Sequence, residues 1–370
     1  MSPGLRVAVL GANGQVGAEL CLLLTRQTDW HIVPVCRTRS GSAFLRWMGL
    51  ACRHGDCSDL RDASRLLGDC DVVVNSALAR GTPARIRRTE DQIVHHAFAC
   101  SRPGAVIVHF STQTVYGDPR RGGVIRWKSP YGRAKLVTER RVLKWQRRLN
   151  KPAFVFRLGH VCGALQNISM QIRDSIERGV VHLPAQESLS NTVYTVVIAE
   201  AIAQAVAGSI VPSVYDLMNV PQWTWTEVYD YESRNIHAPL RAQRATGALP
   251  ARSHDWAQKL LASAARGAIS RPFVHRFGSR IMAHLPNLLN QKAEAWWNLR
   301  RARAEIAELT KWPAIPEHLT HVANGSHFIQ SLTATSELLA AEPYRRILTP
   351  VGPSWPDDQP GASAGPAQIS

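Results

Sequence analysis

Short apolar segments alternate with segments of helical periodicity along the first 160 residues of the chain. Five apolar segments are bounded by turn residues and have the length and composition of buried β-strands. They are Arg6–Leu10, His31–Cys36, Asp71–Asn75, Ala105–Ser111 and Ala153–Leu158. Helical patterns between them include Val16–Arg26 and Tyr131–Arg148. Continuous apolar strands that alternate with helices predict an α/β fold, with a doubly wound parallel sheet covered on both faces.

The pattern changes in the second half of the chain. A short strand and an Ala-rich helix are expected within residues 191–207, and a last strand over Val214–Val220. Beyond about residue 235 the pattern becomes helical, with expected helices at Trp256–Ile269 and Gln291–Leu309. We therefore expect a core over residues 1–165 completed by elements from 191–220, a smaller substrate-binding part with a helical C-terminal extension over 166–348, and a disordered tail over 349–370.

Composition narrows the class of protein. The 370 residues are 45% hydrophobic and 19% charged, which suits a soluble globular protein. We find no apolar segment of about 18 residues that would span a membrane, and the first apolar run is too short for a signal peptide. The seven cysteines are odd in number and contain no CxxC pair. These features predict reduced thiols and a cytoplasmic protein, with no disulfide framework and no metal site.

The chain is strongly basic, with 44 Lys and Arg against 28 Asp and Glu and a net charge of +16. Two blocks, residues 120–148 and 235–304, carry most of the excess. Such blocks favour anionic partners or form a solvated surface. Neither block has the aromatic interleaving of a nucleic-acid module, so we expect no nucleic acid as partner. Block 235–304 has two open interpretations: a helical lid or dimer surface, or peripheral contact with an anionic membrane.

A glycine-rich loop follows the first expected strand, with the spacing G-x-x-G-x-x-G at Gly11, Gly14 and Gly17. Glycines allow the tight turn and bring backbone amides close to a pyrophosphate, which the positive end of the next helix attracts. The loop therefore predicts a dinucleotide site. The residues between the glycines, Asn13, Gln15 and Val16, are expected to contact the cofactor as well.

The end of the second expected strand bears on the choice of cofactor. An acidic residue there would bind the ribose 2′-hydroxyl and repel a 2′-phosphate. This chain has Cys36-Arg37-Thr38-Arg39 and no acid. The planar fork of Arg37 can pair with a 2′-phosphate, which favours NADP over NAD.

A YxxxK motif, Tyr131 to Lys135, begins the helix expected after the fourth core strand. Thr112 follows that strand, three residues before Val115-Tyr116-Gly117. With the glycine loop, these motifs make the chain similar to the extended short-chain dehydrogenase/reductases, the group that contains NAD(P)-dependent sugar epimerases and dehydratases. The resemblance covers about residues 5–230 and implies a Rossmann fold, enzymatic activity and, as is common in this family, a homodimer.

The resemblance assigns further contacts to this sequence. Gly11, Gly14 and Gly17 would face the pyrophosphate of the cofactor. Asp56, with Cys57 beside it, would bind the adenine, and Ala77 would lie next to the cofactor after the third core strand. Lys135 would bind the nicotinamide ribose. The resemblance also covers Glu139 and the segment from Arg157 to Gly163.

Tyr131 and Lys135 are one helical turn apart and share a helix face. The phenol of a free tyrosine titrates near pH 10, so we expect the Lys135 ammonium to lower the pKa of Tyr131. Tyr131 would then move a proton to or from the substrate oxygen while hydride moves to or from the nicotinamide. Thr112 would hold the same oxygen, with the adjacent Ser111 as the alternative.

Departures from the family pattern restrict the substrate. Sugar dehydratases carry Asp-Glu after the active threonine, and here Gln113 and Thr114 stand there, which disfavours dehydration. His160 and Ser190 occupy positions that usually grip a nucleotide diphosphate. We expect Gln113 and His160 to contact a sugar derivative, in the first instance a nucleotide sugar. A lipid-linked sugar or small carbonyl compound at a membrane surface, or a non-catalytic cofactor-binding scaffold, stays open as the alternative.

Overall fold

A computed structural model of the chain describes residues 4–79, 81–117, 130–184, 187–244 and 326–351. The chain divides into two compact units, which we describe separately. The first unit comprises residues 1–174, 189–224 and 313–370, and the second comprises residues 175–188 and 225–312. The first unit contains the sheet and every catalytic candidate.

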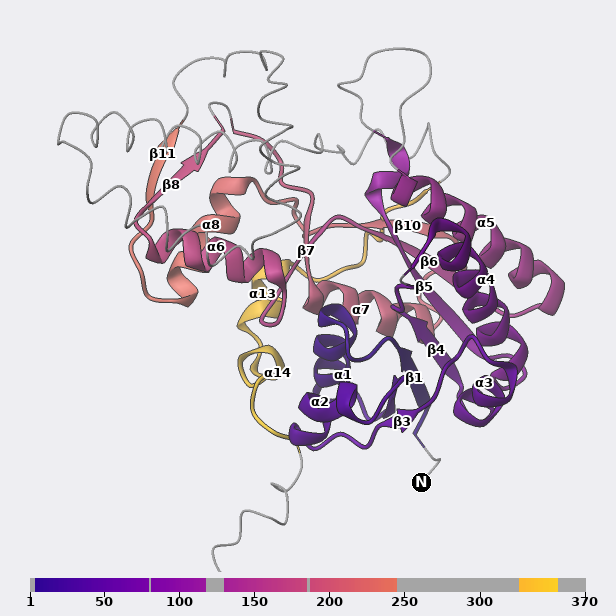
Figure 1. The fold of residues 1–370 in the computed structure, drawn as a ribbon. Helices are drawn as coiled ribbons and strands as arrows, with labels where there is room; N and C mark the ends of the chain where they lie inside the picture. The colour runs from indigo at the N-terminus through magenta and orange to yellow at the C-terminus, as the bar shows by residue number, and fades with distance from the viewer. Residues whose placement is uncertain (1–3, 80, 118–129, 185–186, 245–325, 352–370) are drawn as a thin grey trace, which may run out of the picture. The chain divides into compact units, whose positions relative to one another are not determined.

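The first unit is built on a seven-stranded parallel sheet, which confirms the expected doubly wound α/β fold (Figure 1). The strand order is β10-β6-β5-β4-β1-β2-β3. The strands are β1 Arg6–Leu10, β2 His31–Cys36, β3 Arg53–His54, β4 Val72–Asn75, β5 Val106–Thr112, β6 Ala153–Leu158 and β10 Val214–Leu217. Most of their side chains are buried, as expected for strands covered on both faces.

Helices cover both faces of this sheet (Figure 1). The helices α1 and α7 pack on each other, while α3, α4 and α5 form a consecutive series of neighbours on the opposite side. The larger helices are α1 Gln15–Gln27, α3 Leu60–Leu67, α4 Pro83–Cys100, α5 Pro130–Leu149 and α7 Thr195–Val206, and the short ones are η1 Ser40–Ser42, α2 Ala43–Trp47 and η2 Gln113–Tyr116. Exposed Lys and Arg side chains lie along α4 and α5.

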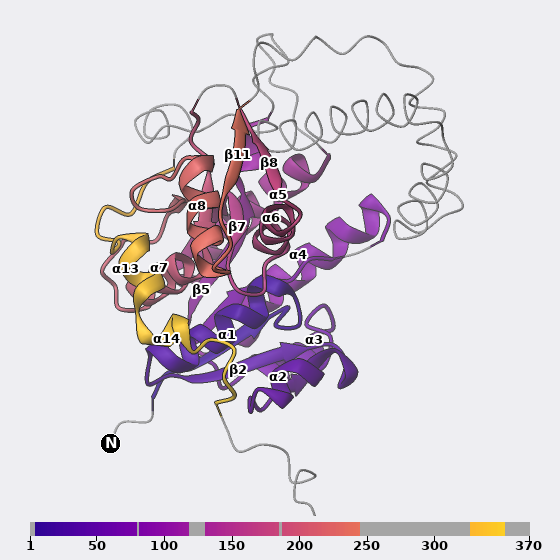
Figure 2. The ribbon, with the colours of Figure 1, turned by 90° about the vertical axis from the view of Figure 1, so that its left-hand side faces the viewer.

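Two smaller additions complete the first unit. The strands β7 His160–Cys162 and β9 Thr192–Tyr194 pair in parallel beside the main sheet. Near the C-terminus, α13 Thr335–Ala340 packs on α7 and α14 Glu342–Arg345 packs on α1 (Figure 2). The end of the chain therefore stabilises the face of the sheet that α1 and α7 cover.

The second unit, as far as the structure describes it, contains β8 Val180–Leu183, α8 Trp225–Asn235 and β11 Arg241–Arg244. The helix α6 Asn167–Glu177 begins in the first unit and ends in this one. β8 and β11 pair in parallel, and Arg244 forms an ion pair with Glu187 at 2.5 Å. The two helices expected within residues 256–309, most of the basic block 235–304 and the tail beyond residue 351 lie outside the described residues.

The expected core elements agree closely with the structure. Three of the five expected strands have the same bounds, and the other two are shifted at their ends. The strand expected over Val214–Val220 ends at Leu217, four residues before Pro221. Within the described residues, no helix is both long and apolar enough to cross a membrane.

Candidate active site

The sheet order reverses between β1 and β4, because the chain runs outward from β1 to β3 and then crosses back to β4. In open parallel sheets, ligands bind at the carboxyl ends of the strands beside such a reversal. The glycine loop follows β1, Asn75 ends β4 and Thr112 ends β5. The fold therefore brings the expected cofactor loop and the expected catalytic strand end to the same edge of the sheet.

The glycine loop is packed too closely for side chains. A Cβ on Gly11, whose φ is +73°, would lie 2.7 Å from the Cα of Ala77. A Cβ on Gly17 would lie 2.5 Å from the carbonyl oxygen of Gly11 and 2.8 Å from the Ser76 hydroxyl. Gly14 is the N-cap of α1 and supplies no side-chain cap, so the first amides of this helix are available to an anion. This loop fits the pyrophosphate of a dinucleotide.

The other expected cofactor residues follow neighbouring strands. Arg37 comes directly after β2 and is exposed. Asp56 follows β3, and its carboxylate accepts hydrogen bonds from the amide and the hydroxyl of Ser58. Cys57 is buried, and its carbonyl accepts a hydrogen bond from the His96 ring. Gln15 donates to Asn167 at 2.6 Å, so its side chain ties the loop to the start of α6.

A buried carboxylate, missed by the sequence analysis, fixes the start of α1. Glu19 is fully buried and accepts hydrogen bonds from the amides of Ala164 and Leu165, from the Gln166 side chain and from the Thr195 hydroxyl. Burial raises the pKa of Glu19, and these donors lower it in part. One carboxylate thus connects α1, the turn after β7 and the start of α7.

Thr112 and Ser111 have different surroundings at the end of β5. The Ser111 hydroxyl is buried and donates to Glu139. Thr112 is partly exposed, and its hydroxyl accepts the amide of Thr114 at 3.2 Å, which leaves its proton to donate. Of the two hydroxyls, that of Thr112 is therefore the one available to a substrate.

Lys135 lies on the buried side of α5. Its side chain is 5% exposed, and its Nζ donates to the carbonyl oxygen of Phe110 in β5 at 3.4 Å. Nζ also lies 3.8 Å from Oε1 of Glu90 in α4, whose other oxygen accepts the Thr138 hydroxyl at 3.1 Å. The sequence analysis did not identify Glu90, which is a buried acid next to the expected catalytic lysine.

Tyr131 begins the same helix and is 46% exposed. Partial burial, followed by the negative charge of Glu90, raises the pKa of Tyr131 above its ordinary value. The expected lowering of this pKa by Lys135 is therefore wrong in this structure. The physical reason is that burial disfavours the charged phenolate, and the negative charge of Glu90 adds to this effect. Burial lowers the pKa of Lys135, and the charges of Glu90 and Glu139 oppose that shift.

A second network of buried, hydrogen-bonded side chains connects the elements that carry the site. Arg157 in β6 forms two hydrogen bonds with the Glu139 carboxylate, at 3.0 and 2.8 Å, and donates to the Tyr116 hydroxyl at 2.8 Å. The Tyr116 hydroxyl donates to Asp216 in β10. Burial, then the charge of Asp216, raises the pKa of Tyr116, so this phenol remains protonated. This network joins β5, α5, β6 and β10.

Gln113 and His109 are buried polar groups with unused hydrogen-bonding atoms. Both amide atoms of Gln113, and Nε2 of His109, have no hydrogen-bond partner among the described residues. The Gln113 amide oxygen lies 3.0 Å from the position of a Cβ on Gly159, directly before β7 and His160. His109 interacts through Nδ1 with the Asn75 amide at 3.2 Å. A buried amide without partners is unusual, and at a strand end it suits a polar ligand.

His160 lies at the start of β7, where its backbone amide donates to the carbonyl oxygen of Asn191. The structure thus places His160, the segment around Ser190, and Gln113 near the same β6–β7 turn. Among the described residues, no cluster of His, Cys, Asp or Glu has the composition of a metal site.

A sequence profile of the NAD-dependent epimerase/dehydratase family matches residues 7–205. The chain belongs to this family. It is thus an enzyme of the extended short-chain dehydrogenase type that uses a nicotinamide dinucleotide, which confirms the resemblance inferred from the motifs. A comparison with curated proteins gives no match.

Solved structures share the fold at low sequence identity. UDP-N-acetylglucosamine 4-epimerase from Bacillus cereus has a TM-score of 0.52 at 18% identity, over 70% of this chain and 93% of that protein. The enzyme WbmH from Bordetella bronchiseptica, solved with NAD+, has a TM-score of 0.50 at 17% identity, over 66% of this chain and 87% of that protein. UDP-glucuronic acid 4-epimerase from Bacillus cereus has a TM-score of 0.50 at 18% identity, over 65% of this chain and 86% of that protein. At these identities, this member of the family shares their Rossmann fold.

Proposed function

We propose that this enzyme is an NAD(P)-dependent epimerase or ketoreductase of a sugar derivative. The observation that carries the proposal is the contact between Lys135 Nζ and the carbonyl oxygen of Phe110, at 3.4 Å. This contact links α5, which bears Tyr131, to the strand that ends in Thr112. That strand end lies at the same sheet edge as a glycine loop whose amides are available to a pyrophosphate.

In this proposal Tyr131 transfers the proton and Thr112 holds the substrate. The Tyr131 side chain is half exposed and accessible to a ligand, whereas Lys135, one helical turn later, is buried. The Thr112 hydroxyl donates a hydrogen bond to the reacting oxygen, because its own lone pair already accepts the Thr114 amide. The nicotinamide supplies the hydride or accepts it. Lys135 positions the phenol and the cofactor ribose through its remaining donors.

The raised pKa of Tyr131 bears on the direction of the reaction. At neutral pH the phenol is protonated, which suits a group that gives a proton to the oxygen of a carbonyl as it is reduced. Oxidation of an alcohol needs the deprotonated phenol instead. Burial, together with the charge of Glu90, thus keeps the phenol in the protonated form that a reduction step uses.

We propose NADP as the cofactor in preference to NAD. Arg37 follows β2 at the position where a ribose 2′-substituent is recognised, and it is exposed. The segment Cys36-Arg37-Thr38-Arg39 contains no carboxylate that would repel a 2′-phosphate. We expect Arg37→Ala to weaken NADP binding by about tenfold or more and to leave NAD binding nearly unchanged, because the charge-assisted bond is made only to the 2′-phosphate.

We propose a nucleotide sugar as the substrate, with Gln113 and His160 among its contacts. The family membership and the unpartnered Gln113 amide support a polar, sugar-like ligand at this edge. The relatives of known structure include epimerases of UDP-sugars, which supports the same substrate class. A lipid-linked sugar or another small carbonyl compound is the alternative that a substrate panel would test.

The test uses purified protein and three variants. Nucleotide bound on purification is identified by mass spectrometry, and NADPH oxidation is measured with a panel of nucleotide sugars and their keto derivatives. We expect Tyr131→Phe and Lys135→Met to lose at least about 100-fold in turnover, and Tyr131→Phe to retain the cofactor. Tyr215→Phe is the control, because among the described residues its hydroxyl donates to the Val211 carbonyl alone. Full turnover in Tyr131→Phe would contradict the proposal, and cofactor binding without any turnover would support a scaffold.

A further inference from the structure

A patch of exposed apolar side chains lies on the first unit, where α2 meets the chain that follows α14. Phe44 and Trp47 belong to α2, and their ring centroids lie 6.2 Å apart. The Val351 amide donates to the Met48 carbonyl at 2.9 Å, which brings the end of the described chain beside α2. Leu348 and Val351 are exposed there. We call Phe44, Trp47, Leu348 and Val351 the α2 patch.

The half of the patch that belongs to α2 is presented by a helix with a firm base. Leu45 and Met48 are buried in the core, whereas Trp47, between them in sequence, is 59% exposed. The Leu50 amide donates to the Leu45 carbonyl at 2.9 Å, which closes the end of the helix. The aromatic side chains therefore face solvent from a fixed position.

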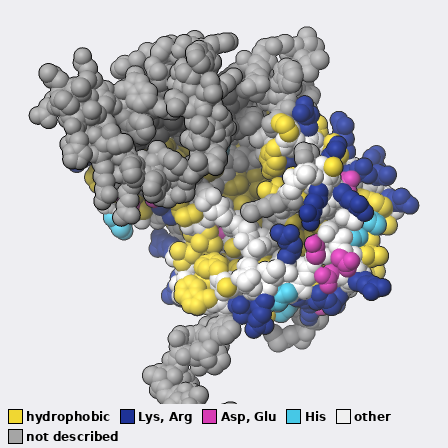
Figure 3. Space-filling model, in the orientation of Figure 1, with side chains coloured by type: hydrophobic (Ala, Val, Ile, Leu, Met, Phe, Trp, Pro, Cys, Tyr) yellow, Lys and Arg dark blue, Asp and Glu magenta, His cyan; other side chains and the backbone are white. Residues whose placement is uncertain are grey.

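The half of the patch that follows α14 is fixed in the same way. Ile347 is buried, and the guanidinium of Arg26 in α1 donates to the Thr349 carbonyl. Leu348, between these two contacts, is 51% exposed. Hydrophobic side chains gather on the surface where α2 and this segment lie, and Lys and Arg side chains border them (Figure 3). Exposed apolar patches of this kind, bordered by polar residues, mark interaction surfaces.

The sequence around the patch is basic and nearly free of acid. Residues 30–55 contain four arginines and residues 343–351 contain two, and neither segment contains Asp or Glu. Arg39 and Arg345 are exposed, and neither forms an ion pair within the described part of the chain. Glu342, just before the second segment, pairs with Arg346 at 3.2 Å. The patch thus combines apolar side chains with uncompensated positive charge.

We propose that the α2 patch docks on the surface of an anionic lipid bilayer. Trp47 and Leu348 enter the headgroup region, while Arg39 and Arg345 remain beside them and contact lipid phosphates. A tryptophan ring with its polar N–H favours the interface between water and hydrocarbon. A guanidinium presents parallel N–H donors that match the oxygens of a phosphate.

The two parts of the patch are both needed for stable docking. A small apolar anchor alone holds a protein to a membrane only marginally, and a second signal such as basic side chains makes the attachment stable. Each Lys or Arg near an anionic leaflet adds a favourable term that disappears within a Debye length and at high salt. The charge around the patch therefore selects an anionic bilayer over a neutral one.

A second copy of the chain fits this surface less well. In a two-fold symmetric dimer the patch would contact itself, so Arg39 and Arg345 would lie close to identical charges. Like charges across an interface oppose association, whereas an anionic bilayer neutralises them.

The test compares matched variants of the full chain in co-sedimentation with vesicles of phosphatidylcholine, with and without phosphatidylglycerol. Trp47→Ser/Leu348→Ser removes apolar side chains from the patch. Leu60→Ser/Val211→Ser removes two side chains of similar exposure from elsewhere on the first unit. Saturating NADP is present throughout, so that a headgroup phosphate does not occupy the cofactor site.

A second pair of variants tests the charge. Arg345→Gln removes one cation beside the patch, and Arg61→Gln removes an equally exposed cation from α3. This pair keeps the proposal testable if the double serine variant of the patch does not fold, which its thermal unfolding curve would show.

We expect wild type to bind the mixed vesicles and to bind phosphatidylcholine alone at least about tenfold more weakly, with affinity that falls as salt rises. The patch variant should bind the mixed vesicles about tenfold or more weakly than its control, and Arg345→Gln about fivefold more weakly than Arg61→Gln. Equal binding within either pair, or no binding by wild type, would overturn the proposal. A self-association of wild type that is lost in the patch variant would assign the patch to a protein contact and overturn it too.

The outcome is independent of the proposed enzymatic function. Tyr131→Phe, which tests that function, leaves the α2 patch unchanged and should bind vesicles as wild type does. Should NADP fail to bind, the difference within each pair of variants still reports on the patch, because none of the four variants alters the glycine loop.

Discussion

Two buried ion pairs connect α5 to its neighbours, and they differ in geometry. Arg157 and Glu139 form two parallel hydrogen bonds at 3.0 and 2.8 Å. Lys135 and Glu90 approach only to 3.8 Å, and Nζ has its other contact with the Phe110 carbonyl at 3.4 Å. Both pairs are buried.

The difference separates a structural pair from one that is available for chemistry. The Arg157 guanidinium already donates hydrogen bonds to Glu139 and Tyr116, so few of its N–H donors remain for a ligand. An ammonium has three donor protons, and both contacts of Lys135 are long. A ribose hydroxyl or a phenolate can therefore compete for Nζ. Glu90 of the looser pair contributes to the raised pKa of Tyr131, and the tighter pair holds the strands and α5 together.

The largest effect on stability is expected from breaking the Arg157–Glu139 pair. Arg157→Ala leaves the Glu139 carboxylate buried without its partner, and we expect a loss of about 3–5 kcal/mol in the free energy of unfolding. Urea denaturation followed by circular dichroism measures it. Arg345→Ala, at an exposed position of α14, should change this free energy by less than about 0.5 kcal/mol. Similar losses in the two variants would show that the Arg157 pair is not structural.

A smaller loss of stability and a clear change in titration are expected from Glu90→Gln. Glutamine still accepts the Thr138 hydroxyl, and Lys135 still donates to the Phe110 carbonyl. We therefore expect a loss of about 1–2 kcal/mol in the free energy of unfolding. The pKa of Tyr131 should fall part of the way, because burial still raises it and only the charge of Glu90 is gone. The pKa of Lys135 should fall too, because the same charge opposed its desolvation.

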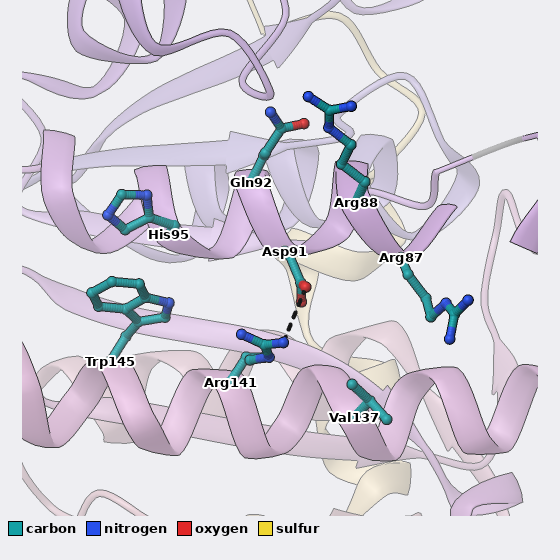
Figure 4. Close-up of a pocket in the computed structure, with 8 residues that line it drawn as sticks. All are labelled: Arg87, Arg88, Asp91, Gln92, His95, Val137, Arg141 and Trp145. Carbon is teal, nitrogen blue, oxygen red and sulfur yellow. Dashed lines mark ion pairs between the residues drawn. The ribbon is translucent and has the colours of Figure 1, made fainter. Parts of the chain in front are cut away.

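Difference absorbance of tyrosinate measures the first of these shifts without any substrate. The signal of Tyr131 is obtained by subtracting the corresponding Tyr131→Phe protein from each variant. Asp91→Asn is the matched control, because this neighbouring acid is partly exposed and pairs with Arg141 (Figure 4). A Tyr131 titration that moves equally in both variants would remove Glu90 from this role.

The smallest effect on stability is expected at the partly exposed ion pairs of Asp69. Asp69 contacts Arg53 and Arg6, and its side chain is 40% exposed. The hydrogen bonds and charge of Arg53, aided by Arg6, hold the pKa of Asp69 below its ordinary value. Its contribution is therefore present above about pH 4 and is lost as the pH falls through the lower, folded-state pKa. We expect Asp69→Asn to cost up to about 1 kcal/mol at neutral pH.

Stability curves of wild type and Asp69→Asn against pH should converge in acid, because protonation removes the same charge as the substitution. A difference that persists at the lowest pH would assign the stabilisation to packing instead.

Features encoded by backbone geometry could be predicted from the sequence. The glycine loop, the core strands and the shared face of Tyr131 and Lys135 depend on local spacing, and the structure contains the loop and the strands as expected. The two-residue strand β3 is too short to give a pattern. The sequence did not show which hydroxyl, that of Thr112 or that of Ser111, is available to a substrate. This depends on Glu139 in α5, which accepts the Ser111 hydroxyl.

The charge around Tyr131 could not be predicted, because Glu90 lies 48 residues before Thr138, its hydrogen-bond donor. A signal was present nonetheless. Lys135, Thr138 and Glu139 are polar residues on the buried side of α5, and polar groups in a core require partners. The sequence thus indicated that an acid was needed but not which one.

The four donors gathered by Glu19 have a consequence for ligand exchange. The same carboxylate holds the helix that follows the dinucleotide loop, the turn after β7 and the first residue of α7. The glycine-loop helix and the turn after β7 are therefore coupled through one side chain. We expect a substitution of Glu19 to alter binding and release at the proposed nucleotide site and at the proposed sugar site together.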